Sequence, residues 1–178
     1  MNNKIGIFFG TASGTTRLIA KKISQKLGDS AAKPLNVNRI GMEELLNFDF
    51  LILGTPTYGD GIAPGLETGA ENGSWQEFYP KLSDNCLQGK TVALYGLGDQ
   101  DKYSERFASG LGDLYSKITA AGAKTIGDWS TEGYSFDQSN AVIDDKFVGL
   151  VIDHINQSLL TDQRLDQWLE IIKPQMKH

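Results

Sequence analysis

The sequence has little of the chemistry that builds metal centres and disulfides. It contains one cysteine, Cys86, and two histidines, His154 and His178. A single cysteine excludes an internal disulfide and a cysteine-based metal cage, and no histidine lies close enough in the sequence to activate Cys86 as a nucleophile. We therefore expect no metal site, and we assign Cys86 no role beyond packing as a buried or half-exposed thiol.

Long apolar runs and an excess of basic residues are also missing. No stretch approaches the roughly 18 apolar residues of a membrane span, and the polar start MNNK lacks the apolar core of a signal peptide. The 17 Lys and Arg against 22 Asp and Glu residues give a net charge of −5, which argues against nucleic acid and acidic membranes as partners. We expect a soluble, cytoplasmic protein.

Apolar runs of strand length alternate with amphipathic helical patterns, and the whole chain, residues 1–178, is predicted to form one domain. Strands are expected at Ile5–Phe9, Leu35–Val37, Phe50–Gly54, Thr91–Leu97 and in a last strand made of Lys124–Gly127 and Phe147–Ile152. An excursion at about 128–146 interrupts that last strand. Helices are expected before Gly28, at Met42–Asn47, from the capping box Ser74-x-x-Glu77, between Phe107 and Gly122, and from a capping Thr161 to Pro174.

This alternation predicts an α/β fold, in which a doubly wound, five-stranded parallel sheet has helices on both faces. Ligands of such sheets lie beyond the carboxyl ends of the strands. The first loop at that edge, Thr11–Thr16, offers four hydroxyls and unhindered N–H groups at a helix start, which suits a phosphate. It contains no Lys or Arg and matches neither common nucleotide-binding glycine motif. Alone, it is equally consistent with a helix cap formed by Ser13 or Thr15.

Two further loops at the same edge each place one aromatic residue among glycines, Tyr58 after the third strand and Tyr103 after the fourth. A single tyrosine usually serves packing, but a phosphate loop together with two tyrosines indicates a mononucleotide, and a flavin suits a cleft between two aromatic rings. The long polar segment Gly61–Gly73 is open to two interpretations, a functional or mobile loop and a tolerated surface insertion.

These loops and the split last strand together resemble a long-chain flavodoxin over essentially the whole chain. The segments Gly61–Gly73 and Phe147–Leu150 are most similar to flavodoxins of the nitrogen-fixation type. The resemblance implies strand order 2-1-3-4-5 and a non-covalent FMN. It also implies a low-potential one-electron carrier and not an enzyme, acting as a monomer. The implied redox partners are a flavoprotein reductase or a pyruvate-oxidising enzyme as donor and the nitrogenase iron protein as an acceptor.

The resemblance also implies a role for each loop residue. The residues that would bind the phosphate are Thr11, Ala12, Ser13, Gly14, Thr15 and Thr16. The inner face of the flavin would be lined by Thr57, Tyr58, Gly59 and Asp60, the outer face would stack on Tyr103, and the pyrimidine edge would meet Leu97, Gly98 and Asp99. The chain departs from common family residues at Arg17 (Glu in many relatives), Tyr58 (Trp), Arg106 (Asn) and Ile155 (an Asp near the ribityl chain).

Two features are expected to favour one-electron chemistry. Rotation of the Gly59–Asp60 peptide would let the Gly59 carbonyl accept a hydrogen bond from the flavin semiquinone. Negative charge on Asp60, Asp99 and Asp101 would oppose the second electron, and Lys102 and Arg106 would offset part of it. The alternatives are an NAD(P)H-dependent flavin enzyme such as a quinone reductase, a phospho-acceptor signalling domain and a scaffold. No second nucleotide motif supports the first, and the acidic residues of the second are missing.

Overall fold

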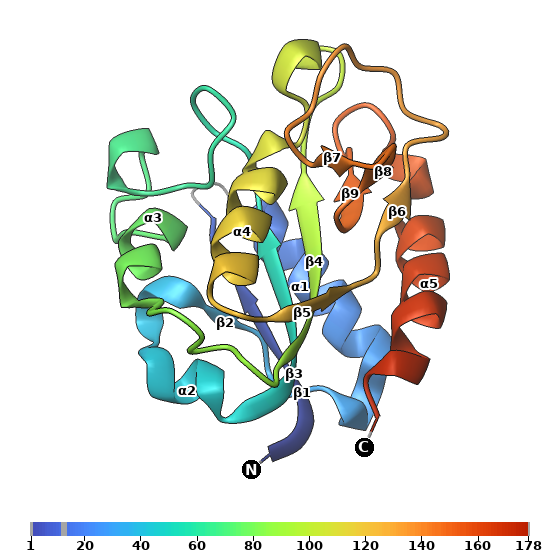
Figure 1. Ribbon diagram of the computed structural model, residues 1–178. Coiled ribbons are helices and arrows are strands. Elements are labelled where there is room, and N and C mark those ends of the chain that lie inside the picture. Colours follow the sequence, from blue (N-terminus) through green and yellow to red (C-terminus); the bar gives the residue numbers. More distant parts are fainter. Residues whose placement is uncertain (1, 12–13, 178) are drawn as a thin grey trace.

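The computed structural model describes residues 2–11 and 14–177. The main sheet is parallel, with strand order β2-β1-β3-β4-β5, and β9 also pairs with β4 (Figure 1). Its strands are β1 (Asn2–Phe9), β2 (Leu35–Asn36), β3 (Phe48–Thr55), β4 (Thr91–Leu97), β5 (Lys124–Ile126) and β9 (Leu150–Ile152). The predicted fold class and strand order are confirmed.

The last strand position is split, as predicted. Thr91 to Ala93 of β4 pair with β5, and Tyr95 to Leu97 pair with β9. The chain therefore leaves the sheet after β5 and returns as β9 on the same side of β4. Between the two pairings, only Leu94 of β4 is skipped. Gly149 precedes the return, and Phe147, which was predicted to belong to the main strand, pairs instead within the excursion.

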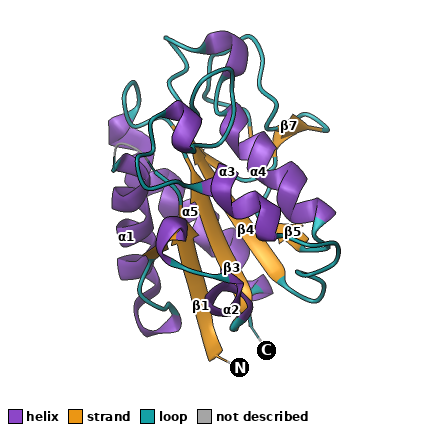
Figure 2. Ribbon diagram, turned by 90° about the vertical axis from the view of Figure 1, so that its left-hand side faces the viewer, coloured by secondary structure: helices purple, strands orange, loops and turns teal. Residues whose placement is uncertain are grey.

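Helices cover both faces of the sheet, and Figures 1 and 2 show the three layers. One face carries α1 (Thr15–Leu27) and α5 (Thr161–Ile172), and the other carries α2 (Met42–Leu46), α3 (Trp75–Phe78) and α4 (Ser109–Ala120). Short 3₁₀ helices are found at Gly28–Ser30, Val37–Arg39, Leu66–Thr68, Tyr79–Lys81, Ser104–Arg106, Ser158–Leu160 and Lys173–Gln175.

The two-sided core follows from the alternation of side chains along each strand. In β1, Ile5, Ile7 and Phe9 face α1 and α5, whereas Phe8 faces α3 and α4. Continuous apolar runs of this kind are stable only when both faces of a strand are covered. Two ion-paired lysines of α1 also join it to α5, because Lys22 lies 3.2 Å from Asp162 and Lys26 lies 2.7 Å from Asp166.

The excursion between β5 and β9 forms a small antiparallel sheet of its own. Its strands are β6 (Trp129–Ser130), β7 (Val142–Ile143) and β8 (Lys146–Phe147), in the order β6-β8-β7. Tyr134 fixes this sheet to the core, because its hydroxyl donates to the Val151 carbonyl and the Arg164 guanidinium lies 4.0 Å above its ring. The aromatic residues of this segment are thus packing residues.

Two helix starts differ from the sequence prediction. The Ser74 N–H donates to Glu77 as a capping box requires, but the buried Ser74 hydroxyl has no hydrogen-bond partner among the described residues. After four residues, α3 is followed by a 3₁₀ turn that contains Pro80. Thr161 is the first residue of α5 and not its cap, since its hydroxyl lies 3.1 Å from His154 Nδ1. At Thr161, a contact with another loop therefore replaces the predicted cap.

Candidate functional site

A cleft of about 490 Å³ opens at the carboxyl edge of the sheet, where the loops after β1, β3, β4 and β9 meet. This volume lies in the range of ordinary small-ligand sites. The lining residues are Thr15, Thr16, Pro56, Thr57, Tyr58, Gly59, Leu97, Gly98, Asp99, Tyr103, Arg106, Ala108, His154 and Ile155. The predicted edge of the sheet therefore carries a cavity built mainly from the predicted loops.

The loop after β1 ends at Gly14, whose φ of 99° lies in the left-handed region, and α1 starts at Thr15. The Gly14 N–H donates to Thr11 Oγ1 at 2.8 Å. No side chain among the described residues caps α1, so the cap interpretation of Thr15 is wrong, and Ala12 and Ser13 lie outside the described residues. Thr11 and Gly14 line a neighbouring hollow of about 760 Å³ that is open to solvent.

Thr16 is the most informative residue of this loop. It is completely buried, at 0 % exposure, and its Oγ1 has no hydrogen-bond partner among residues 2–11 and 14–177, although Thr16 belongs to the lining of the cleft. An unpartnered buried hydroxyl costs about 1–3 kcal/mol. Thr16 is therefore an unsatisfied polar residue in the lining at this end of the cleft, and a ligand that forms a hydrogen bond there would satisfy it.

The loop after β3 is a tight turn with a fixed base. The Thr57 hydroxyl accepts from the Gly110 N–H at 2.9 Å and donates to the Leu97 carbonyl at 3.2 Å, so it joins this loop to α4 and β4. Tyr58 and Ile62 pair across the turn, and Gly59 has a φ of 53°. Asp60 is exposed in the turn and is not one of the lining residues.

The loop after β4 is held by Asp99. Its carboxylate accepts from the Lys102 N–H at 3.0 Å, and its carbonyl accepts from the Tyr103 N–H at 2.9 Å. Tyr103 is 38 % exposed, and its ring has the Arg106 guanidinium at 5.1 Å and the Lys102 ammonium at 5.3 Å. Of these two cations, Arg106 belongs to the lining of the cleft.

The loop after β9 contributes a wall that the predicted set of cofactor-binding residues did not include. His154 and Ile155 both line the cleft, and Ile155 is 73 % exposed. Their position directly after a buried strand was a signal, because every parallel strand ends at this edge. Ala108 is a further lining residue that the prediction missed. It has a φ of 52°, and no local sequence signal marks an alanine for the left-handed region.

The segment Gly61–Gly73 is tied to the body of the protein. Asp113 of α4 accepts from the Ala63 N–H at 3.0 Å and from the Gln76 amide at 2.9 Å. Glu77 accepts from the Leu66 N–H at 3.2 Å. The segment forms a wall of the neighbouring hollow and not of the cleft, so its two sequence interpretations both stay open.

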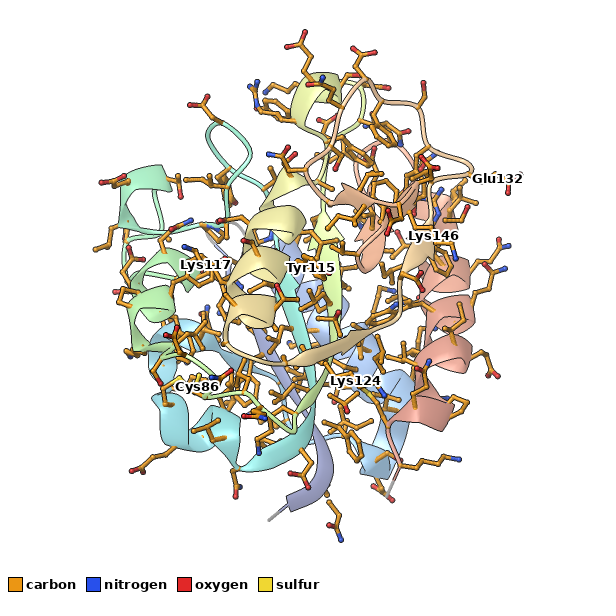
Figure 3. All side chains as sticks on the ribbon, in the orientation of Figure 1. Cys86, Tyr115, Lys117, Lys124, Glu132 and Lys146 are labelled. Atoms are coloured by element: carbon orange, nitrogen blue, oxygen red, sulfur yellow. The ribbon has the colours of Figure 1, made fainter. Side chains whose placement is uncertain are left out.

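Within residues 2–11 and 14–177, no group of three His, Cys, Asp or Glu side chains is arranged to hold a metal ion. In the same part of the chain, no helix is long and apolar enough to cross a membrane. Cys86 is partly exposed and lies low in the view of Figure 3, away from the carboxyl ends of the strands. It is not a lining residue of the cleft.

Comparison with known proteins gives a consistent result. The profile of the flavodoxin family matches residues 7–168. A flavodoxin of Klebsiella pneumoniae is 52% identical over 95% of this chain and 96% of its own, and one of Helicobacter pylori is 44% identical over 96% of each. The crystal structure of the Fusobacterium nucleatum flavodoxin bound to flavin mononucleotide is 36% identical, with a TM-score of 0.87 over 98% of this chain and 99% of that one.

Proposed function

This chain belongs to the flavodoxin family, and on that premise we propose how its cleft holds FMN and sets its redox behaviour. The protein is an electron-transfer protein and not an enzyme, and FMN is its cofactor. When bound, FMN supplies the capacity to accept and release electrons one at a time. The chain's residues supply the binding, the shielding from water and the electrostatic field.

The described residues fit this cofactor, and the buried, unpartnered hydroxyl of Thr16 is the observation that carries the proposal. A phosphate provides the hydrogen-bond acceptor that this hydroxyl lacks. Tyr58 and Tyr103 line the same cleft and supply aromatic surface for a planar ring. A scaffold role would leave the cavity and the two tyrosines that line it without a purpose.

We propose that the first loop binds the phosphate through N–H and O–H groups, without a cation of its own. Gly14, Thr15 and Thr16 lie at the positive end of α1, a helix of 13 residues. The full set is Thr11, Ala12, Ser13, Gly14, Thr15 and Thr16, of which Ala12 and Ser13 lie outside the described residues. Arg17, the next residue, borders the neighbouring hollow, where it lowers the negative potential around the phosphate.

We propose that the other two loops hold the ring. Tyr103 would stack on its outer face, and Leu97, Gly98 and Asp99 would meet its pyrimidine edge. Thr57, Tyr58, Gly59 and Asp60 would form the inner wall. Thr57 would act there through its backbone, because its hydroxyl already bridges Gly110 and Leu97.

Two groups of the chain are proposed to set the redox behaviour. Neither the Gly59 carbonyl nor the Asp60 N–H has a hydrogen-bond partner among the described residues, so the peptide between them is free to turn. We propose that the Gly59 carbonyl would turn into the cleft and accept a hydrogen bond from a ring N–H of the reduced cofactor. The carboxylate of Asp99, which lines the cleft, would oppose the second electron.

We propose that the partners are other redox proteins. The candidate donors are a flavoprotein reductase and a pyruvate-oxidising enzyme, and the nitrogenase iron protein is a candidate acceptor. A net charge of −5 favours partners with basic docking surfaces. We propose that this electron transfer takes place in the cytoplasm and that the carrier is a monomer of one domain. Cell fractionation checks the location, and light scattering checks the oligomeric state.

A stepwise reductive titration of the purified protein, followed by its visible spectrum, tests the proposal. We expect one FMN per chain and two separate one-electron steps. A single two-electron step, or rapid bleaching by NADPH without an added reductase, would contradict the carrier function and favour a hydride-accepting flavin enzyme. For docking, transfer rates that stay flat as ionic strength rises would contradict electrostatic steering.

A further inference from the structure

Asp153 follows β9 directly and is only 1 % exposed. It is not a lining residue of the cleft, and none of the ion pairs in the described part of the chain includes it. A buried carboxylate without an ion pair is costly unless hydrogen bonds satisfy it. Its partners therefore indicate why the fold keeps it.

The carboxylate accepts four hydrogen bonds, two from each of two loops. On the side of the loop after β4, Oδ2 accepts from the Gln100 N–H at 3.0 Å and from the Gln100 side-chain amide at 2.7 Å. On the side of its own loop, Oδ1 accepts from the Asn156 N–H at 2.9 Å and Oδ2 accepts from the Asn156 side-chain amide at 2.9 Å.

Both loops carry residues that line the cleft. Gln100 follows Asp99 in the chain, and Asn156 follows Ile155. The Asn156 amide also donates to Asp99 Oδ1 at 2.8 Å, so one amide joins the buried carboxylate to the carboxylate at the cleft. The Gln100 side-chain oxygen in turn accepts from the Ser135 N–H at 2.7 Å, which brings the excursion into the same network.

We propose that Asp153 is a positioning residue that clamps the loops after β4 and β9 together, and so fixes the place of Asp99 and Ile155 against the cofactor. This inference rests on the proposed cofactor site. A fixed carboxylate at the cleft interacts differently with oxidised and reduced FMN, so the clamp sets the difference between their affinities. That difference sets how far the reduction potential of bound FMN is shifted from that of free FMN.

The test uses two variants and one matched control in the full-length chain. Asp153→Asn places an amide N–H₂ opposite donors and breaks the clamp. Gln100→Met keeps every formal charge and a similar volume but loses the side-chain bonds to Asp153 and Ser135. Asp101→Asn removes one negative charge from the same loop, at an exposed side chain with no hydrogen bond among the described residues.

We expect Asp153→Asn to weaken FMN binding about tenfold and to shift both midpoint potentials by more than Asp101→Asn does. A tenfold change in the ratio of the affinities for the two redox states corresponds to a shift of about 59 mV for a one-electron step. Gln100→Met should shift the potentials too, although no charge changes. In the cofactor-free chain, both variants should speed amide hydrogen exchange over residues 98–103 and 154–157.

Three results separate the possibilities. Unchanged hydrogen exchange in both variants would overturn the clamp whatever FMN does. A second contrary result would be equal shifts of the potentials in Asp153→Asn and Asp101→Asn, with wild-type potentials in Gln100→Met. Asp153 would then act only through its charge, and the clamp would again be overturned. Failure of the wild-type chain to bind FMN would instead contradict the proposed function, and the exchange experiment would still decide the clamp. If Asp153→Asn does not fold, Gln100→Met decides.

Discussion

The hydroxyl of Tyr95, in β4, donates a hydrogen bond of 3.0 Å to the backbone carbonyl of Thr16 in the first turn of α1. The ring is fully buried, and burial raises the pKa of Tyr95, so the group remains a donor at any physiological pH. The bond joins an interior strand of the sheet to the start of the helix that carries the hydroxyl loop. The position of that loop is thereby tied to a strand that is paired on both sides.

Replacement of Tyr95 tests whether its hydrogen bond to Thr16 holds the start of α1 in place. Tyr95→Phe should lower the free energy of unfolding by about 1 kcal/mol and weaken FMN binding several-fold, because the start of α1 loses its anchor. Urea unfolding and FMN titration measure the two effects. Tyr115→Phe is the matched control, since the Tyr115 hydroxyl makes no hydrogen bond in the described part of the chain. Equal effects in both variants would contradict this role for Tyr95.

Thr16→Val should separate folding from cofactor binding. Valine has the shape of threonine and removes a hydroxyl that has no partner in the cofactor-free chain. The cofactor-free variant should therefore be as stable as the wild type or more stable, whereas FMN should bind about tenfold more weakly. Thermal unfolding without FMN and fluorescence titration with FMN give the two numbers. A loss of stability without a loss of affinity would show that the hydroxyl does not serve the ligand.

Gly59→Ala should narrow the gap between the two midpoint potentials. Gly59 has a φ of 53°, where a side chain costs about 1 kcal/mol or more, and alanine also resists rotation of the Gly59–Asp60 peptide. The first reduction then becomes harder and the second easier. Spectroelectrochemistry measures both steps. If neither potential moves, the Gly59 carbonyl does not take part in redox control.

Arg106→Gln should make the second midpoint potential more negative. The Arg106 side chain lines the cleft and has no ion pair among the described residues, so its charge is available to offset a second negative charge there. We expect a shift of roughly 20–60 mV, the size of a charge interaction at a half-exposed site. Lys102→Gln removes the same charge from outside the lining and should shift it less. A larger shift in the control would contradict the assignment.

The loss of folding stability at acid pH should depend on Asp153. Burial raises the pKa of its carboxyl, but the hydrogen bonds from Asn156 and Gln100 outweigh burial and hold the pKa below its ordinary value. The stability that these bonds contribute is then present above the unfolded-state pKa of about 4 and is lost as the pH falls further. The stability difference between wild type and Asp153→Asn should shrink below about pH 4. Urea unfolding from pH 7 to pH 3 checks this, and a constant difference would contradict it.

Local patterns were sufficient to predict the elements that bury one continuous apolar stripe or run. The strands β1, β3 and β4 were predicted because they are continuous apolar runs, and the helices α1 and α5 because their apolar residues repeat at helical spacing. Hydroxyl contacts across the fold could not be predicted this way. The Thr161 hydroxyl lies next to His154 of another loop, and the Ser74 hydroxyl has no partner in the described part of the chain.

The candidate site was predictable where its loops carry hydroxyl residues, glycines or a tyrosine. It was less predictable where tertiary contacts alone place a residue at the site. Gly54 illustrates the limit. The sequence suggests only a strand end, but a Cβ there would lie 1.9 Å from the ring of Tyr95, so this glycine makes room for the anchor of α1. Asp153 is similar, because nothing in the segment Ile152–Asn156 indicates that Gln100 lies beside it.

The split of the last strand has an evolutionary consequence. Because β5 and β9 pair with successive parts of β4, the residues between them can change in length or sequence without shifting the register of the sheet. A change confined to that segment would therefore leave in place the strands whose loops line the cleft. The hydrogen bond between Ser135 and Gln100 is a point where such a change would reach the flavin loop.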